Sequence, residues 1–120
     1  MDKINIAVVG SRTFEDYDKM KSILDVFVGI HLEKDICIVS GGAKGADSLG
    51  EEYARKNNLE FLCFKPEWGK YGKVAAFLRN KDIVKASDRV VAFWNGKSAG
   101  TKHTLDEARR SDIPSYIVNF

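Results

Sequence analysis

The sequence predicts a Rossmann-like α/β domain in three layers, with a five-stranded parallel sheet of strand order 3-2-1-4-5 and helices on both faces. Two observations support this fold class. Short apolar runs of strand length alternate along the chain with longer segments whose apolar residues recur at three- and four-residue spacing. The runs are apolar almost throughout, as expected for parallel strands that are buried on both faces. Right-handed crossovers would place the reversal of strand order between the first and fourth strands.

The first half of the chain contains three of the predicted strands and two of the helices. Their order is strand 4–9, helix 16–32, strand 36–39, helix 46–58 and strand 61–64. The first of these helices is predicted from Tyr17, Met20 and Leu24, which lie on one helical face. The second is predicted from the similar spacing of Ala46 and Tyr53 with the apolar residues between them.

The second half begins with a predicted loop at 65–72, which contains one proline, two glycines and two aromatic residues. A helix is expected over 73–86 and a strand over 89–94. After a loop at 95–100, Leu105 and Ala108 indicate a fourth helix that stops before Ile113. The run 116–118 is the closing strand.

The composition is that of one globular domain. The chain has 120 residues, 44% of them hydrophobic and 30% charged, and a net charge of +2. No linker or repeat divides it, so we expect a single domain over 1–120. The near-neutral charge gives no strong nucleic-acid signal. No run approaches the roughly 20 apolar residues of a membrane span, and we expect a cytoplasmic protein.

Metal and common cofactor sites are not expected. The two cysteines have no CxxC spacing, and His31 and His103 are isolated from each other. The sequence GGAKGAD at 41–47 matches neither the dinucleotide pattern GxGxxG nor the P-loop pattern GxxxxGK[ST]. We therefore predict neither a metal nor a cofactor of the usual dinucleotide kind.

Three loops carry the unusual residues, and each follows a predicted strand. They are 10–14 after the first strand, 40–47 after the second and 94–101 after the fourth. Ligands of open parallel sheets bind at the carboxyl ends of the strands, where the strand order reverses. We therefore expect these loops to form one site, unless their glycines make only tight turns and their hydroxyls only cap helices.

An anion is the ligand that these residue types favour. Glycines let the backbone approach a phosphate, and each loop leads to a helix N-terminus with unpaired N–H groups and a partial positive charge. Arg12 adds a planar guanidinium that can bind phosphate through two hydrogen bonds. Ser11, Ser98 and Thr101 add hydroxyl donors, and Ala43 belongs to the second loop.

Three further polar residues have alternative interpretations. Asp47 either complements the dipole of its helix or accepts hydrogen bonds from a ribose, and it is the one candidate catalytic acid. Asn80 shares a helical face with Phe77 and Val84, so its amide needs either a backbone carbonyl or a ligand as partner. Arg79 either belongs to the site or pairs with Asp82 on the surface.

The same residues resemble the SLOG superfamily, and most closely its small YspA-like (YAcAr) branch of bacteria and phages. The resemblance is carried in order by VVGSRTFEDY, IVSGGAKGAD, PEWGKYGKVA, RNKDIV and AFWNGKSAGTKHTLDEAR. It implies a Rossmann-like fold and a pocket for nucleotides or derivatives of the ADP-ribose kind. The pocket residues that it implies are Gly10, Ser11, Arg12, Gly41, Gly42, Gly45, Ala46, Asp47, Arg79, Asn80, Trp94, Ser98, Gly100 and Thr101.

The resemblance leaves three functions open. The first is a module that senses or sequesters a nucleotide-like small molecule. The second is a phosphoribohydrolase or N-glycosidase of the Lonely Guy (LOG) type. However, the LOG pattern has a glutamate three positions after its threonine, and this chain has Thr104 at that position. The third is a single-stranded DNA binder, suggested by the related DNA-processing proteins. Self-association is also expected, through an apolar surface that includes Val74, Ala75 and Ala76.

Overall fold

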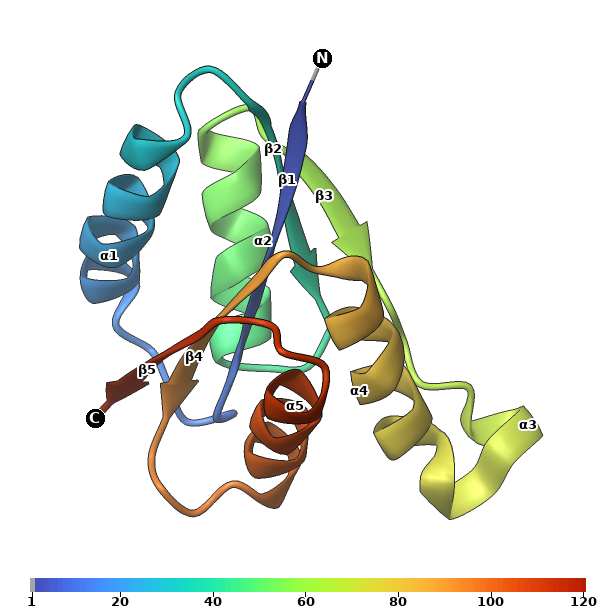
Figure 1. Cartoon of the computed structure of the whole chain (residues 1–120). Helices are drawn as coiled ribbons and strands as arrows, with labels where there is room; N and C mark the ends of the chain where they lie inside the picture. The colour runs from blue at the N-terminus through green and yellow to red at the C-terminus, as the bar shows by residue number, and fades with distance from the viewer. Residues whose placement is uncertain (1) are drawn as a thin grey trace.

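The computed structural model describes residues 2–120, and its five strands form one parallel sheet in the order β3-β2-β1-β4-β5. This confirms the predicted fold class and strand order (Figure 1). The central strand β1 pairs with β2 on one side and with β4 on the other. The strands are β1 Lys3–Gly10, β2 Asp35–Ser40, β3 Glu60–Cys63, β4 Arg89–Trp94 and β5 Ser115–Asn119.

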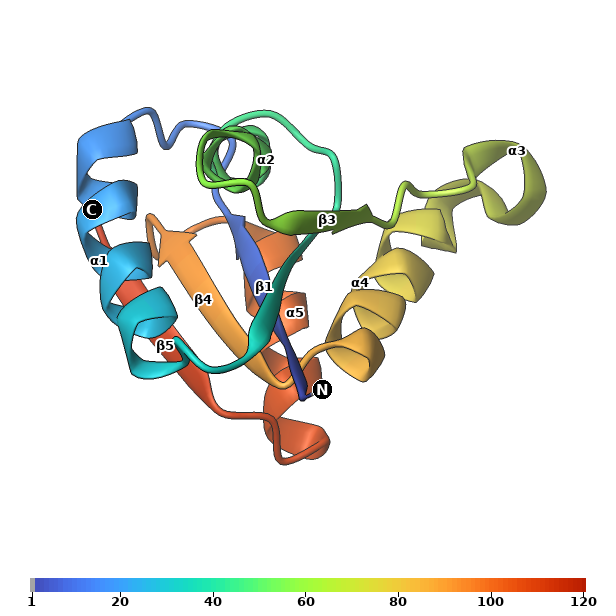
Figure 2. The same ribbon diagram turned by 90° about the horizontal axis from the view of Figure 1, so that it is seen from above.

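Helices cover both faces of the sheet, as predicted. Figure 2 shows α1 and α2 on one side of the strands and α4 and α5 on the other. Each long helix begins close to its predicted start, and α5 ends before Ile113 as expected. The helices are α1 Tyr17–Ile30, α2 Ala46–Lys56, α3 Trp68–Tyr71, the 3-10 turn η1 Gly72–Val74, α4 Ala75–Ala86 and α5 Ala99–Arg110.

Alternate residues of the central strands β1, β2 and β4 enter two separate cores. On one face, Ile6 and Val8 of β1 pack among residues of α1 and α2, including Leu24 and the fully buried Tyr53. The other core lies under α4 and α5, and its residues are Ala7, Val9, Cys37, Val39, Ile83, Val84, Val90, Ala92 and Ala108. Because both faces of the strands are buried, the central strands need apolar residues at nearly every position, which is the pattern that the sequence shows.

The segment 68–72 differs from the prediction, because it is helical rather than a loop. Its proline and glycines favour a loop, yet the backbone N–H groups of Lys70 and Tyr71 both donate to the Glu67 carbonyl and close a short turn. This turn, α3, extends away from the sheet (Figures 1 and 2), and Trp68 is 54% exposed. No helix within residues 2–120 is long and apolar enough to cross a membrane.

A second difference concerns Ala75, which the sequence interpretation placed on an exposed apolar surface. Ala75, the first residue of α4, is buried, whereas Val74 and Phe77 are about half exposed. Residues two positions apart on a helix point to opposite sides, so Ala75 and Phe77 cannot share a face. The apolar surface of this region therefore runs through Trp68, Tyr71, Val74, Phe77 and Leu78.

Candidate functional site

A cavity of about 430 Å³ lies at the carboxyl ends of β1 and β4, where the strand order reverses. This is where ligands bind in open parallel sheets. Its walls come from the loops after β1, β2 and β4, from α4 and from the N-terminal half of α5. The lining residues are Val9, Gly10, Ser11, Arg12, Thr13, Ala43, Asp47, Ala76, Phe77, Arg79, Asn80, Ile83, Asn95, Ser98, Gly100, Thr101 and Thr104.

Ser11, at the end of β1, connects the three loops. Its hydroxyl oxygen accepts from the N–H of Asn95 (3.1 Å), and its carbonyl accepts from the N–H groups of Phe14 and Ala46. The side chain is almost fully buried. Because a hydroxyl that accepts one bond still has its own proton to donate, Ser11 keeps a donor for a ligand in the cavity.

Arg12 follows Ser11 at the rim of the cavity. Its side chain is exposed, and it forms no ion pair or hydrogen bond with any residue of the described part of the chain. A guanidinium has five N–H donors and stays protonated at any physiological pH. Arg12 is thus a cation whose full donor set is open to a ligand.

The loop between β2 and α2 passes beneath the cavity. Its Gly45 has a φ of +78°, and a Cβ there would collide with the carbonyl oxygens of Ser11 and Arg12. Glycine is the residue that permits both this backbone conformation and this close approach. Gly45 thereby sets the distance between the first and second loops.

The carboxylate of Asp47 accepts hydrogen bonds from N–H groups of the loop that precedes α2, and not from N–H groups of α2 itself. One oxygen of its carboxylate accepts from the N–H groups of Gly41 (3.0 Å) and Ala43 (3.3 Å). Burial raises the pKa of Asp47 to about 6, although the N–H groups of Ala43, Gly41 and Gly10 and the charge of Arg79 act in the opposite direction. The expectation that Asp47 complements the dipole of α2 is therefore incomplete, because its carboxylate mainly holds the backbone of residues 41–43 in place through these hydrogen bonds.

Arg79 enters the site from α4 and forms no pair with Asp82 within residues 2–120. Its Nη1 donates to the carbonyl of Gly41, and its Nε donates to Oδ1 of Asn80 (2.9 Å). Burial lowers the pKa of Arg79, and the neighbouring Asp47 carboxylate opposes that effect. Arg79 therefore remains charged and is fixed against the second loop.

The N-terminus of α5 forms the last wall. Ser98 caps this helix, since its hydroxyl accepts from the N–H of Thr101 (3.4 Å) and lies 3.1 Å from the Thr101 hydroxyl. The N–H groups of Ala99 and Gly100 have no hydrogen-bond acceptor among residues 2–120. A helix start with free N–H groups attracts anions.

Comparison with known proteins places the chain in a family. Residues 4–71 match the family model described as YspA, cpYpsA-related SLOG family. The Gene 61 protein of Mycobacterium phage D29 is 32% identical over an alignment 123 residues long, which covers 96% of this chain and 94% of the phage protein. The chain belongs to this SLOG family. The resemblance read from its motifs is therefore confirmed.

Solved structures support the fold of this SLOG chain. DNA processing protein A (DprA) of Streptococcus pneumoniae has a TM-score of 0.77 at 19% identity, over 98% of this chain and 50% of that protein. DprA of Helicobacter pylori has a TM-score of 0.73 at 18% identity, over 95% and 64%. The protein TM1055 has a TM-score of 0.65 at 17% identity, over 96% and 72%. The chain thus spans about half to two thirds of the DprA proteins.

The SLOG cavity contains most, but not all, of the residues that the sequence singled out. The candidates that do not line it are Gly41, Gly42, Gly45, Ala46 and Trp94. The first four of these lie between the end of β2 and the first residue of α2, close in sequence to the lining residues Ala43 and Asp47. Trp94 donates its indole N–H to the Ser98 carbonyl (3.1 Å) and lines a separate cavity between α5 and β5.

Seven lining residues were not among the candidate site residues: Val9, Thr13, Ala76, Phe77, Ile83, Asn95 and Thr104. Thr13 and Asn95 lie in the predicted loops and could have been included by proximity alone. Phe77 and Thr104 are exposed to the cavity only because α4 and α5 pack side by side, which no local sequence pattern reports. No group of three His, Cys, Asp or Glu side chains in the described residues is arranged to hold a metal ion.

Proposed function

We propose that this SLOG chain binds a nucleotide or nucleotide derivative, with a phosphate between Arg12 and the N-terminus of α5. The observation that carries the proposal is the unpaired Arg12 guanidinium at a cavity bounded by free helix N–H groups. Sensing or sequestering such a molecule would then need no further chemistry. The related proteins named above support a nucleotide-related role but identify no ligand.

The charges around the cavity favour an anion. Arg12 and Arg79 are the lining cations, and Asp47 is the lining acid. The Asp47 carboxylate is 95% buried and already accepts backbone hydrogen bonds, so it repels a phosphate at the rim only weakly. A cavity of about 430 Å³ lies within the range of small-molecule sites, roughly 300–1,000 Å³.

Calorimetric titration tests the proposal by comparing the affinities of the chain for AMP, ADP and ADP-ribose with its affinity for adenosine, which has no phosphate. Arg12→Ala should weaken binding of the phosphorylated compounds by about 1.5–3 kcal/mol, the range of hydrogen bonds to charged groups, and adenosine binding much less. Arg55→Ala is the matched control, because Arg55 is an exposed arginine at the other end of α2. Equal losses for nucleotide and nucleoside, or no binding of any phosphorylated compound, would contradict the proposal.

Hydrolysis of the ligand is the alternative that Asp47 favours, because a carboxyl with a pKa of about 6 can transfer protons near neutral pH. Its hydrogen bonds to Gly41 and Ala43 instead fit a structural carboxylate, and we expect binding without rapid turnover. Chromatography of the same mixtures measures this directly. Release of free base that disappears in Asp47→Asn, with binding retained, would make the chain an enzyme.

Single-stranded DNA is the other alternative. The H. pylori DprA, of which this chain covers 64%, is described with a single-stranded DNA binding mode. Here Trp68 and Tyr71 are half exposed on α3 beside Lys70, and exposed aromatic residues next to cations can stack on bases. An oligonucleotide that competes with ADP, or that binds only while Trp68 is present, would favour this ligand.

A further inference from the structure

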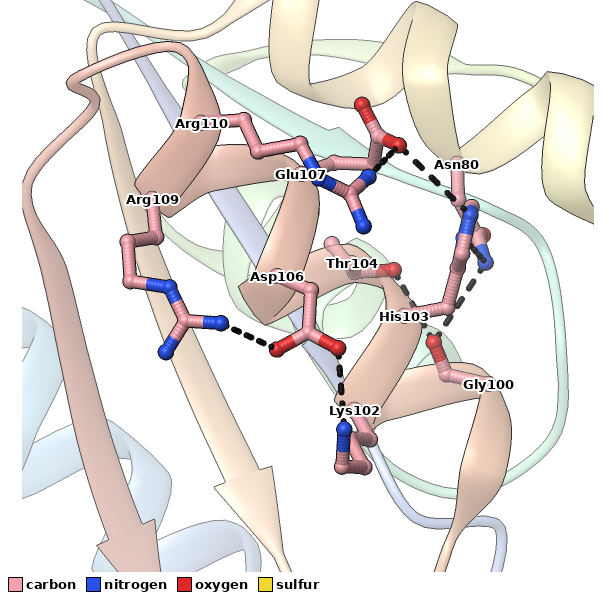
Figure 3. Close-up of polar contacts among 9 residues, drawn as sticks. All are labelled: Asn80, Gly100, Lys102, His103, Thr104, Asp106, Glu107, Arg109 and Arg110. Carbon is pink, nitrogen blue, oxygen red and sulfur yellow. Dashed lines mark hydrogen bonds and ion pairs between the residues drawn. The ribbon is translucent and has the colours of Figure 1, made fainter.

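His103 lies behind the cavity wall, in a chain of polar contacts between α4 and α5 (Figure 3). Its Nδ1 is 3.2 Å from Nδ2 of Asn80, and its Nε2 is 3.7 Å from Oε1 of Glu107. Asn80 itself lines the cavity and is buried. Through Asn80, the histidine is one contact away from the candidate binding site.

The orientation of the Asn80 amide is fixed from both ends. Its Oδ1 faces Nε of Arg79 (2.9 Å), which can only donate, and its Nδ2 faces the Gly100 carbonyl (3.3 Å), which can only accept. The Nδ2 group is therefore the donor toward His103, so Nδ1 of His103 must be an unprotonated acceptor. The imidazole is consequently neutral, with its proton on Nε2 toward Glu107.

Asn80 connects two walls of the cavity. Arg79, which Asn80 holds at Nε, bridges to the Gly41 carbonyl in the second loop. Gly100, which Asn80 holds at its carbonyl, is in the first turn of α5. A rotation of the Asn80 amide would therefore disturb both the position of Arg79 and the N-terminus of α5.

We propose that His103 is a positioning residue for ligand binding: its neutral ring accepts from Asn80 and so holds Arg79 and the start of α5 in their binding geometry. The proposal rests on the proposed function. A protonated ring would place an N–H opposite the Asn80 NH₂ group. The amide would then have to turn, and its NH₂ group would face the donor Nε of Arg79. Protonation of His103 should thus weaken ligand binding.

The groups that face His103 determine when it takes up a proton. Glu107, Asp106 and Arg110 surround it from α5, and Lys81 faces it from α4. Phe77 of α4 packs against its ring edge-on, with the ring centroids 4.6 Å apart. Burial lowers the pKa of His103, and Glu107 opposes that shift. The neutral ring is therefore the form present at neutral pH.

The test compares three proteins, with ADP as the probe, by calorimetry between about pH 8 and about pH 5. His103→Asn keeps an acceptor for Asn80 but cannot titrate. His103→Leu removes the acceptor. His31→Asn is the matched control, because His31 follows the C-terminus of α1 and does not line the cavity.

At about pH 8, His103→Asn should bind ADP within about twofold of the wild type, and His103→Leu about tenfold more weakly, as expected for one lost hydrogen bond. On acidification, the wild type and His31→Asn should lose affinity about tenfold more than His103→Asn does. Asp47 and the terminal phosphate of ADP titrate in the same range but are present in every variant. Their effects therefore cancel in the comparison.

Identical pH profiles for the wild type and His103→Asn would overturn the proposal. So would undiminished binding by His103→Leu. If ADP does not bind the wild type at any pH, the proposed function fails for this probe, and His103 is tested by NMR of the free protein. There, the ¹⁵N shifts should identify Nδ1 as unprotonated, and the Asn80 side-chain amide signals should move as His103 titrates. A proton on Nδ1 would refute the inferred geometry.

Discussion

At the scale of single residues, Asp47 has the most unusual environment. It is a carboxylate that is 5% exposed, with Arg79 as the nearby charge. The backbone N–H groups of Gly41 and Ala43 compensate part of its desolvation, but burial is the larger effect and raises its pKa to about 6. A carboxyl with a raised pKa binds its proton more tightly in the folded protein than in the unfolded chain.

This environment predicts a pH-dependent stability. Between the ordinary pKa of 3.8 and the folded value of about 6, the folded protein binds more protons at Asp47 than the unfolded chain does. The contribution of Asp47 is therefore fully present below pH 3.8 and is lost as the pH rises through about 6. The loss is on the order of 3 kcal/mol of unfolding free energy.

Urea denaturation at several pH values gives the unfolding free energy of the wild type and of Asp47→Asn as a function of pH. The difference between the two proteins in the slope of unfolding free energy against pH measures the contribution of Asp47. Asp25 and Asp106 have lowered pKa values and act in the opposite direction, but both are present in each protein. We expect the variant to lack the decline in stability between about pH 4 and about pH 6. The same slope in both proteins would refute the assignment.

At the scale of elements, the start of α2 depends on a single glycine. Gly45 combines a φ of +78° with carbonyl oxygens of the first loop at the position that a Cβ would occupy. Gly45→Ala should therefore lower the unfolding free energy by at least about 2 kcal/mol, from backbone strain and overpacking together. Thermal unfolding followed by circular dichroism measures this.

Gly29→Ala provides the control for that prediction. Gly29 lies in α1, and a Cβ there would meet nothing within 4 Å. Alanine is favoured over glycine in a helix by roughly 0.5–1 kcal/mol. This variant should therefore be as stable as the wild type or slightly more stable. Equal destabilisation of both variants would indicate a general sensitivity to alanine and not a contact at Gly45.

The elements that the sequence predicted well are those with a strong period. Strands buried on both faces and helices with a regular apolar face were predicted close to their observed positions, because burial imposes those patterns on every residue. The short α3 was missed because local hydrogen bonds to Glu67, and not a buried face, determine it. All four of its residues are exposed, Trp68 to 54% and Tyr71 to 42%, so no apolar period marks it.

The candidate site was predictable as far as it depends on strand ends. Ser11, Arg12, Asp47, Ser98 and Thr101 follow strands whose order could be inferred, and all line the cavity. The role of His103 could not be found in this way, since it depends on which side of α5 faces Asn80 of α4. The alternative for Asn80 is resolved in part, because its amide does donate to a backbone carbonyl, that of Gly100.

At the scale of the whole molecule, an exposed apolar surface near the cavity runs along α3 and the start of α4. Its residues are Trp68, Tyr71, Val74, Phe77 and Leu78. Apolar side chains grouped in this way mark interaction sites more often than isolated ones do. Self-association through this surface therefore stays a prediction, although Ala75 no longer contributes to it.

Light scattering should give a mass near twice 13.4 kDa at high concentration. Val74→Asp should return the protein to the monomer mass, because it introduces a charge into the surface. Val26→Asp is the matched control, since Val26 is similarly exposed on α1, on the opposite face of the sheet. A wild-type mass of 13.4 kDa, or equal effects of the two variants, would exclude this interface.

The pairing of β1 with β4 has a consequence during synthesis of the chain. The backbone N–H of Asn5 donates to the carboxylate of Asp88, 83 positions later, and the two strands continue in register to Gly10 and Phe93. While a ribosome is still producing the segment before β4, Ser11 and Arg12 have no opposite wall. Contacts of such long sequence separation form late, because loop closure must precede them. A nascent chain can therefore bind the proposed ligand only after β4 and the start of α5 have emerged.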